Sequence, residues 1–232
     1  EIRAFMPRYG CINERKNQLH EVIRLSGMNI IIGDVDRPLV IKVASISSAR
    51  IQVYFIDNED YFRRKQISYD ADGKFFEDNG QRAIFFARGV LETVKKLRWA
   101  PDVIHCQGWI SHLVPLYLKK AYNGDPIFSG SRIVTSLYNE AAEEKLSPSL
   151  KDNVLFGGIK PADVSLLEEP TGINLAKTAA LYSDGIILGD KDVAPELVKF
   201  CEERSMPILP FSEDSISSGR YIEEYDGFYQ QL

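Results

Sequence analysis

Alternating apolar and polar residues predict a series of strands in the first quarter of the chain. The opening stretch, Ile2–Met6, predicts a strand that Pro7 ends. The block that follows is rich in β-branched residues and is broken by Ser-, Gly- and Asp-containing turns. Its predicted strands are Leu19–Leu25, Met28–Ile32, Pro38–Ile46 and Ile51–Ile56. This pattern predicts an antiparallel meander or a pair of hairpins, with Asp34-Val35-Asp36 as one of its turns.

A long loop and a helix follow this block. Residues 58–79 are polar and aromatic without regular periodicity, which predicts a loop, and their aromatic side chains favour an ordered one. From Gln81 to Leu97 the apolar residues recur at the spacing of one helical face. Lys95 and Lys96 suit the negative end of that helix, and Trp99-Ala100-Pro101 ends it.

Beyond residue 100, short apolar strands alternate with helical segments. The predicted strands are Val103-Ile104, Ile133–Ser136, Gly185–Leu188 and Pro207–Leu209. The predicted helices are the segment from Gly108 to about Tyr122, Leu150–Phe156, Pro170–Tyr182 and Ala194–Arg204. Such alternation is typical of parallel βαβ units. The aromatic tail, Gly219–Leu232, predicts a helix that closes the fold or binds a partner.

These elements predict an α/β fold: a Rossmann-like parallel sheet flanked by helices, with the β-hairpin block as an insertion or edge. A length of 232 residues fits one large domain or two small ones, and we predict a single domain over residues 1–232. The chain begins at Glu1 without a methionine and apparently inside a strand. We therefore expect the natural start to lie before residue 1, and the family resemblance given below implies a first strand and a glycine loop there.

Composition narrows the class of protein. A net charge of −5 argues against a general nucleic-acid binder. No apolar run reaches the roughly 18 residues that span a bilayer. Cys11, Cys106 and Cys201 are far apart and have no zinc-ligand spacing, so we expect no metal site and reduced, cytoplasmic surroundings.

The turn after the strand at Val103-Ile104 carries the strongest candidate chemistry. Ligands bind at the carboxyl ends of strands in open parallel sheets. His105 either faces a ligand there or only hydrogen-bonds to the backbone at the strand end. Trp109 either stacks on a sugar or base, or packs in the core at the start of the helix.

Other candidate residues favour structural roles. His112 lies one helical turn further on and is expected near solvent, and His20 falls in an alternating strand. Cys106 is expected to be a small buried residue, because no neighbouring base marks it as a nucleophile. Asp70-Ala71-Asp72 resembles a metal-binding pair of carboxylates, but a glycine-bearing acidic surface turn fits better.

Four motifs in order give the chain a family resemblance. They are Met6-Pro7-Arg8-Tyr9, Tyr54-Phe55-Ile56-Asp57-Asn58, Asp78-Asn79-Gly80-Gln81-Arg82 with Phe85-Phe86-Ala87, and the run from Pro101 to Trp109. Ser183-Asp184-Gly185-Ile186-Ile187 adds a fifth. Together they resemble the amino-terminal domain of bacterial glycogen synthases and plant starch synthases, over essentially the whole chain.

The resemblance implies a GT-B architecture, in which two Rossmann-like domains face each other. The amino-terminal domain holds the α-glucan acceptor, and the carboxyl-terminal domain holds most of the ADP-glucose donor. The implied reaction transfers glucose from ADP-glucose to an α-1,4-glucan with retention of configuration and without a metal or other cofactor. By resemblance, Tyr69, His105, Trp109 and Asn139 are acceptor-side residues, and no catalytic residue is assigned.

The chain departs from the family pattern at two positions. Gln107-Gly108 stands where the family has His-Asp before the tryptophan, so a carboxylate is absent there. The next strand continues as Leu137-Tyr138-Asn139, where the family has a histidine before the asparagine. The resemblance also implies that transfer needs a second, donor-binding Rossmann domain, and none follows Leu232. We therefore expect a glycogen-synthase-like acceptor half that is inactive alone and acts with a separately encoded donor domain or as a homo-oligomer. The alternative is a non-catalytic module that binds glycogen or regulates its metabolism.

Overall fold

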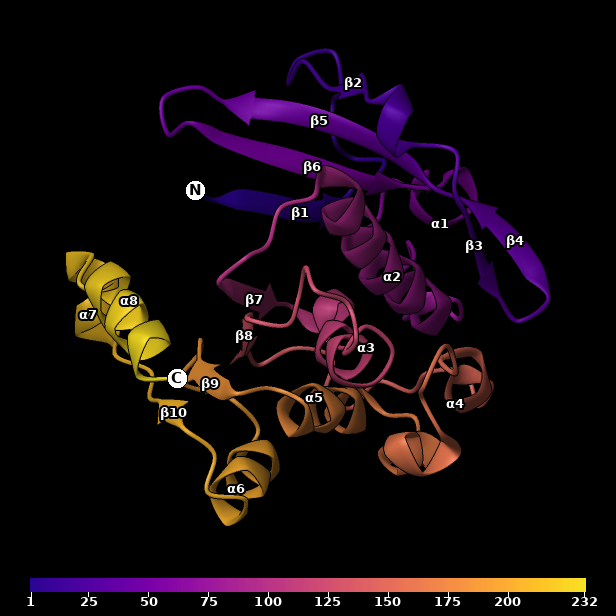
Figure 1. Cartoon of the computed structure of the whole chain (residues 1–232). Helices are drawn as coiled ribbons and strands as arrows, with labels where there is room; N and C mark the ends of the chain where they lie inside the picture. Colours follow the sequence, from indigo (N-terminus) through magenta and orange to yellow (C-terminus); the bar gives the residue numbers. More distant parts are fainter. The chain divides into compact units, whose positions relative to one another are not determined.

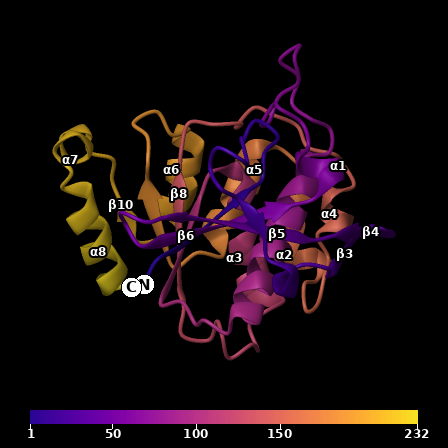
Figure 2. The same cartoon turned by 90° about the horizontal axis from the view of Figure 1, so that it is seen from above.

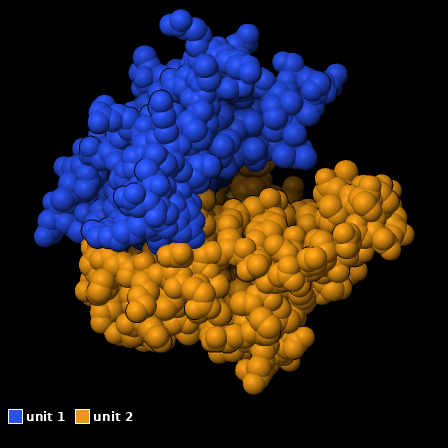
Figure 3. Space-filling view, turned by 180° about the vertical axis from the view of Figure 1, so that it is seen from behind, with its two compact units in different colours: residues 1–97 blue, residues 98–232 orange.

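The computed structural model describes all 232 residues and divides the chain into two compact units, residues 1–97 and 98–232 (Figure 3). Each unit has its own four-stranded sheet. A single domain over residues 1–232 therefore stays a prediction.

Unit 1 is built on a mixed sheet with the order β1-β6-β5-β2. Its strands are β1 (Arg3–Pro7), β2 (His20–Glu21), β5 (Val40–Ile46) and β6 (Ile51–Asp57). β1 runs parallel to β6, whereas β5 is antiparallel to both β6 and β2. A separate antiparallel hairpin joins β3 (Asn29–Ile32) to β4 (Val35–Pro38). The antiparallel character of this block is confirmed.

Two predictions in this block are wrong in detail. The strand expected over Leu19–Leu25 is only two residues long, because the chain turns at η1 (Ile23–Leu25), where the Ser26 N–H and hydroxyl both bond to Val22 O. The turn expected at Asp34-Val35-Asp36 lies one residue earlier. Gly33 takes a φ of 60°, and Val35 already pairs with Ile32 across the hairpin.

Helix α2 (Asn79–Leu97) covers the sheet of unit 1 with its apolar face (Figure 1). Ile84, Phe85 and Leu91 are almost completely buried along it. Helix and sheet approach most closely at Gly89, where an added Cβ would lie 2.9 Å from Ile56 Cγ2. A residue without a side chain is therefore required for this packing distance.

Buried Arg82 orders the aromatic loop that precedes α2. Its guanidinium donates to Tyr61 O at 2.9 Å, to Ile67 O at 2.8 Å and to Asn79 Oδ1 at 2.7 Å. It also lies over the ring of Phe62 at 5.2 Å. Desolvation lowers the pKa of this side chain. The loop is ordered as predicted, although it includes a short helix, α1 (Glu59–Phe62), which the sequence pattern did not indicate.

Asn58 explains why that short helix forms. Its side chain accepts hydrogen bonds from the backbone N–H groups of Asp60 and Tyr61 and donates to Pro38 O. The first two bonds satisfy N–H groups that would otherwise lack partners at the start of α1. The third ties the loop to strand β4.

Unit 2 is built on a parallel sheet with the order β10-β9-β8-β7. Its strands are β7 (Val103–Gln107), β8 (Arg132–Leu137), β9 (Gly185–Leu188) and β10 (Ile208–Leu209). All four strands lie where strands were predicted, but β7 continues to Gln107 and so passes the end expected before His105. The parallel pairing confirms the expected βαβ organisation.

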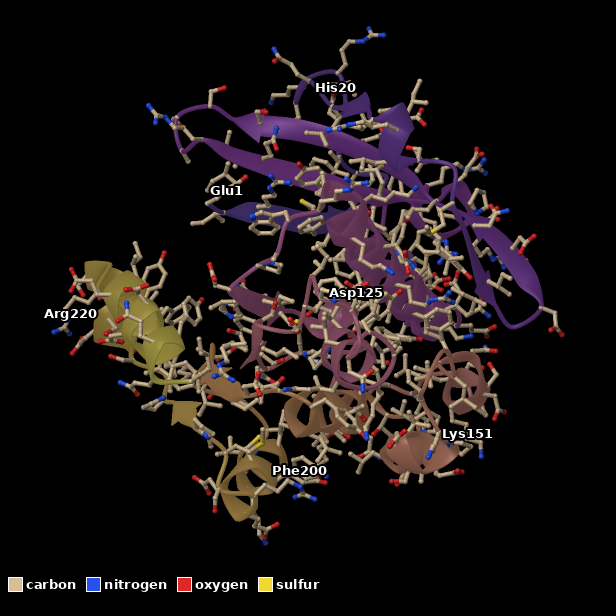
Figure 4. The ribbon with its side chains drawn as sticks, viewed as in Figure 1. Glu1, His20, Asp125, Lys151, Phe200 and Arg220 are labelled. Carbon is tan, nitrogen blue, oxygen red and sulfur yellow. The ribbon has the colours of Figure 1, made fainter.

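Helices cover both faces of this sheet. The helical segments are η2 (Trp109–Ser111), α3 (Val114–Lys120), α4 (Leu150–Asn153), η3 (Pro161–Glu168), α5 (Gly172–Leu181), α6 (Pro195–Glu203), α7 (Glu213–Ser218) and α8 (Tyr221–Gln231). Helices α5 and α6 pack on one face, where Leu137 and Ile186 meet Phe200 (labelled in Figure 4) and its neighbours. Helix α8 packs on the other face through Phe228 (Figures 1 and 2). The aromatic tail is therefore a closing helix, one of its two predicted roles.

No helix of either unit combines the length and the apolar character that crossing a membrane requires.

Candidate functional site

The carboxyl ends of β7 and β8 lie side by side in unit 2. Their parallel register pairs Gln107 with Ser136. After Gln107 the chain turns at Gly108, whose φ of 79° is in the left-handed region that favours glycine. The turn continues through η2, where Ser111 N and Oγ both donate to Gly108 O, at 3.0 and 2.7 Å. Residues Tyr138–Glu140 follow β8 at the same edge of the sheet. The two places where the chain departs from the family pattern, Gln107-Gly108 and Tyr138, therefore both lie at this edge.

Trp109 points into the protein. Only 8% of its surface is exposed, which leaves little of the ring for a sugar to stack on. This favours the second interpretation of the residue, a core tryptophan at the start of a helix. A contact between Trp109 and an acceptor stays a prediction.

His105 lies in the middle of β7, two residues before the strand ends. Its Nδ1 lies 2.7 Å from the Tyr229 hydroxyl and its Nε2 lies 2.6 Å from Ser136 Oγ. Both ring nitrogens therefore bond to side chains, not to the backbone as one interpretation expected. Burial lowers the pKa of His105 to about 4, so the ring is neutral at pH 7.

The tail supplies part of this cluster. Tyr229 and Tyr225 both lie on α8, and each ring centroid is 5.8 Å from that of His105. Burial raises the pKa of Tyr229 to about 12, so its hydroxyl stays protonated. The aromatic pattern of the tail indicated that it would pack, but nothing in the sequence linked it to His105. Tyr229 and Ser136 thus hold the His105 ring through hydrogen bonds to its two nitrogens.

His112 and Glu140 form a second polar group at this edge, which sequence reasoning missed. Both line a cavity of about 10 Å³, together with Leu137, Asn139 and Gly172. His112 was expected near solvent, but only 3% of its surface is exposed, because η2 turns the residue inward before α3 begins. Neither ring nitrogen of His112 has a hydrogen-bond partner, and Glu140 Oε1 has none either.

The other predicted residues lie apart from this cavity or at its rim. Asn139 is exposed just beyond β8. Tyr69 belongs to unit 1, where it forms a β-bridge with Phe75 and is 38% exposed. Cys106 is buried as predicted, and burial raises the pKa of its thiol to about 12, so it is a poor nucleophile. His20 is exposed on β2.

The acidic pair in the loop of unit 1 has a structural role. Asp70 Oδ1 accepts hydrogen bonds from the backbone N–H groups of Asp72 and Lys74, at 2.9 and 2.8 Å. This is the geometry of a capped surface turn, as predicted. No group of three or more His, Cys, Asp or Glu side chains gathers in the structure as metal ligands would. The three cysteines are free thiols.

Comparison with known proteins places this geometry in a family. Residues 1–206 match the model of the starch synthase catalytic domain. The chain is 36% identical over 201 residues to the glycogen synthase of Chlorobium limicola, covering 85% of this chain and 40% of that protein. It is 40% identical over 223 residues to the glycogen synthase of Chlorobium phaeobacteroides, covering 88% of this chain and 43% of that protein.

A solved structure shares the fold. The catalytic domain of starch synthase IV from Arabidopsis thaliana, bound to ADP and acarbose, superposes with a TM-score of 0.69 at 16% identity. The match covers 89% of this chain and 43% of that one. The chain thus spans about 40% of the length of the relatives that it matches. Since the family model covers most of its residues, the chain belongs to the starch synthase catalytic domain family.

Proposed function

We propose that this glycogen/starch synthase-like domain is the acceptor-side half of a glucosyltransferase. It binds the end of an α-1,4-glucan such as glycogen, and ADP-glucose is the donor in the reaction that it serves. The support comes from the family match over residues 1–206, together with a small cavity just beyond the carboxyl end of β8, where His112 and Glu140 lie among mostly apolar residues. In open parallel sheets that edge is where ligands bind.

We further propose that the purified 232-residue chain does not transfer glucose by itself. The chain spans about 40% of the length of the glycogen synthase of Chlorobium limicola, so it supplies only part of what that relative holds, and two observations at the edge of the sheet add to this. Gly108 provides no carboxylate, and Tyr138 stands where the resemblance implies a histidine. Neither group can take the place of the missing one directly: burial raises the pKa of the Tyr138 hydroxyl, so it is neither a base nor a cation near pH 7. We expect transfer to need a donor domain in addition to these 232 residues.

A non-catalytic glucan-binding or regulatory module remains the second candidate. The same two departures favour it, because they remove polar groups without removing the fold. The free thiols suit a reduced cytoplasmic setting for either function. Both candidates bind glucan, so acceptor binding alone does not separate them.

A transfer assay tests the proposal. The purified chain is incubated with ADP-glucose carrying radiolabelled glucose and with glycogen, alone and with a separately produced donor domain of a glycogen synthase. We expect no label in the glycogen with the chain alone, and incorporation only in the mixture. Incorporation by the chain alone would contradict the claim of inactivity. No incorporation in either case favours the non-catalytic module, provided that the chain binds glycogen.

A further inference from the structure

His112 and Glu140 line a shared cavity, and three of their buried polar atoms have no hydrogen-bond partner within the fold. Nearly all buried polar groups in proteins have a hydrogen-bond partner, and a buried group without one is costly. Here three polar atoms lack a partner: both ring nitrogens of His112 and Glu140 Oε1. All three belong to side chains that line one cavity at the edge where β7 and β8 end. Such a group points to a ligand that completes the hydrogen bonds.

The Glu140 carboxylate lies next to the backbone turn at Gly108. An ideal Cβ on Gly108 would lie 3.9 Å from Glu140 Oε1. The carboxylate of Glu140 therefore lies next to Gly108, the position at which this chain lacks the carboxylate that the family resemblance implies. The Trp109 backbone N–H hydrogen-bonds to this carboxylate and holds it in place. A residue that follows β8 thus supplies a carboxylate next to the turn that follows β7.

The charge and size of the cavity select the chemistry of its ligand. Burial lowers the pKa of His112 to about 4, so the neutral ring offers one N–H donor and one acceptor. Burial raises the pKa of Glu140, whereas the bond from the Trp109 N–H lowers it; in its ionised form the carboxylate only accepts hydrogen bonds and repels anions. A volume of about 10 Å³ admits a single oxygen atom, not a sugar ring. A hydroxyl, which both donates and accepts, satisfies this set of groups.

We propose that this cavity is a subsite for one hydroxyl of the terminal glucose of an α-glucan. Glu140 Oε1 accepts the hydrogen bond of that hydroxyl, and a ring nitrogen of His112 bonds to the same oxygen. The glucose ring stays outside, at the rim near exposed Asn139. The inference rests on the proposed glucan binding and makes Glu140 and His112 determinants of its specificity. A water molecule is the other source of a hydroxyl group that fits.

Glu140→Gln tests the role of the carboxylate, because it keeps the size of the side chain and an oxygen that can accept from the Trp109 N–H. The binding of maltoheptaose is measured by calorimetry for the wild type, for Glu140→Gln and for Glu223→Gln, an exposed residue of α8 that serves as the matched control. We expect Glu140→Gln to weaken binding about tenfold or more, as the loss of a hydrogen bond to a charged group does. The control should bind as the wild type does.

Thermal unfolding separates this role from a structural one. Glu140→Gln keeps an acceptor for the Trp109 N–H and removes a half-buried charge, so it should leave the melting temperature unchanged or raise it. Weaker binding together with an intact fold is the expected result. Equal binding by the wild type and Glu140→Gln would show that the cavity holds only water, and would overturn the subsite while leaving the proposed function intact. If the wild type does not bind maltoheptaose, both proposals fail.

Two further measurements cover the case in which Glu140→Gln does not fold. In the wild type, the ring nitrogen NMR signals of His112 should shift when maltoheptaose is added, while those of exposed His20 stay in place. Monodeoxy maltosides identify the hydroxyl: one of them should bind the wild type about tenfold more weakly than the parent sugar. Unchanged His112 signals at saturating sugar, or no sensitive hydroxyl, would overturn the subsite.

Discussion

The two buried histidines of unit 2 differ in what surrounds them. His105 has a hydroxyl on each ring nitrogen, from Tyr229 and Ser136, whereas His112 has no partner at all. Burial lowers both pKa values to about 4. The first ring is therefore a satisfied structural group, whereas the buried nitrogens of the second have no protein hydrogen-bond partner.

The lowered pKa of His105 predicts how stability depends on pH. An unfolded histidine titrates near pH 6.5, whereas folded His105 titrates near 4. Between these values the unfolded chain binds a proton that the folded chain excludes. The stabilising contribution is thus fully present above about pH 6.5 and is lost as the pH falls towards 4. From pH 7 to pH 5, this single group costs roughly 2 kcal/mol of unfolding free energy.

Urea unfolding of the wild type and of His105→Gln at the two pH values measures this effect. Carboxylates contribute equally to both proteins, so the difference isolates the histidine. We expect the wild type to lose more unfolding free energy than the variant between pH 7 and pH 5. Equal losses would mean that His105 titrates normally in the folded protein.

Arg82 gives a second prediction at this scale. Arg82→Met removes the guanidinium and leaves the carbonyl oxygens of Tyr61 and Ile67 without their donor. Since broken buried networks are expensive, we expect a loss of about 3 kcal/mol of unfolding free energy. Urea unfolding measures it, with exposed Arg15→Met as the control. A loss no larger than that of the control would contradict the role of Arg82 in ordering the loop.

Sequence reasoning succeeded at this scale where a residue's surroundings are local. Cys106 was expected to be buried because no neighbouring base marks it as a nucleophile, and it is buried. The roles of His112 and Glu140 were missed, since they depend on a cavity formed by segments nearly thirty positions apart. The spacing of apolar and polar residues along the chain does not reveal such a cavity.

At the scale of elements, close packing between helix and strand sets what each position tolerates. Gly89 of α2 faces Ile56 of β6 at a distance that excludes a methyl group. Gly227 of α8 has open space around the same position. We therefore expect substitution by alanine to have opposite effects on stability at these two glycines.

Gly89→Ala should destabilise unit 1 by about 1–3 kcal/mol, because the strain of overpacking outweighs the gain in helix propensity. Gly227→Ala should instead stabilise the protein by up to about 1 kcal/mol. Thermal unfolding of both variants checks the pair. A stabilising effect of Gly89→Ala would show that α2 and β6 separate more easily than their contact implies.

Most elements were predictable because their patterns are strong. The strands of unit 2 and helix α2 follow from apolar runs and helical spacing. The elements that differed are short and are decided by single hydrogen bonds. The cap at Asn58 creates α1, and the bond between Ser26 and Val22 ends β2 early. Patterns averaged over many residues do not resolve such details.

At the scale of the whole molecule, the family match ends before the tail. It covers residues 1–206, whereas α7 and α8 lie beyond it. Helix α8 nevertheless completes the core of unit 2 through Phe228 and binds His105 through Tyr229. The tail is therefore an integral part of unit 2.

The central claim is that this chain binds the glucan acceptor. Co-sedimentation of the purified chain with glycogen tests it most directly, with maltoheptaose as the soluble competitor. We predict that the chain pellets with glycogen and is released by excess maltoheptaose. A chain that stays in the supernatant at every glycogen concentration, while its unfolding transition shows that it is folded, would contradict the account.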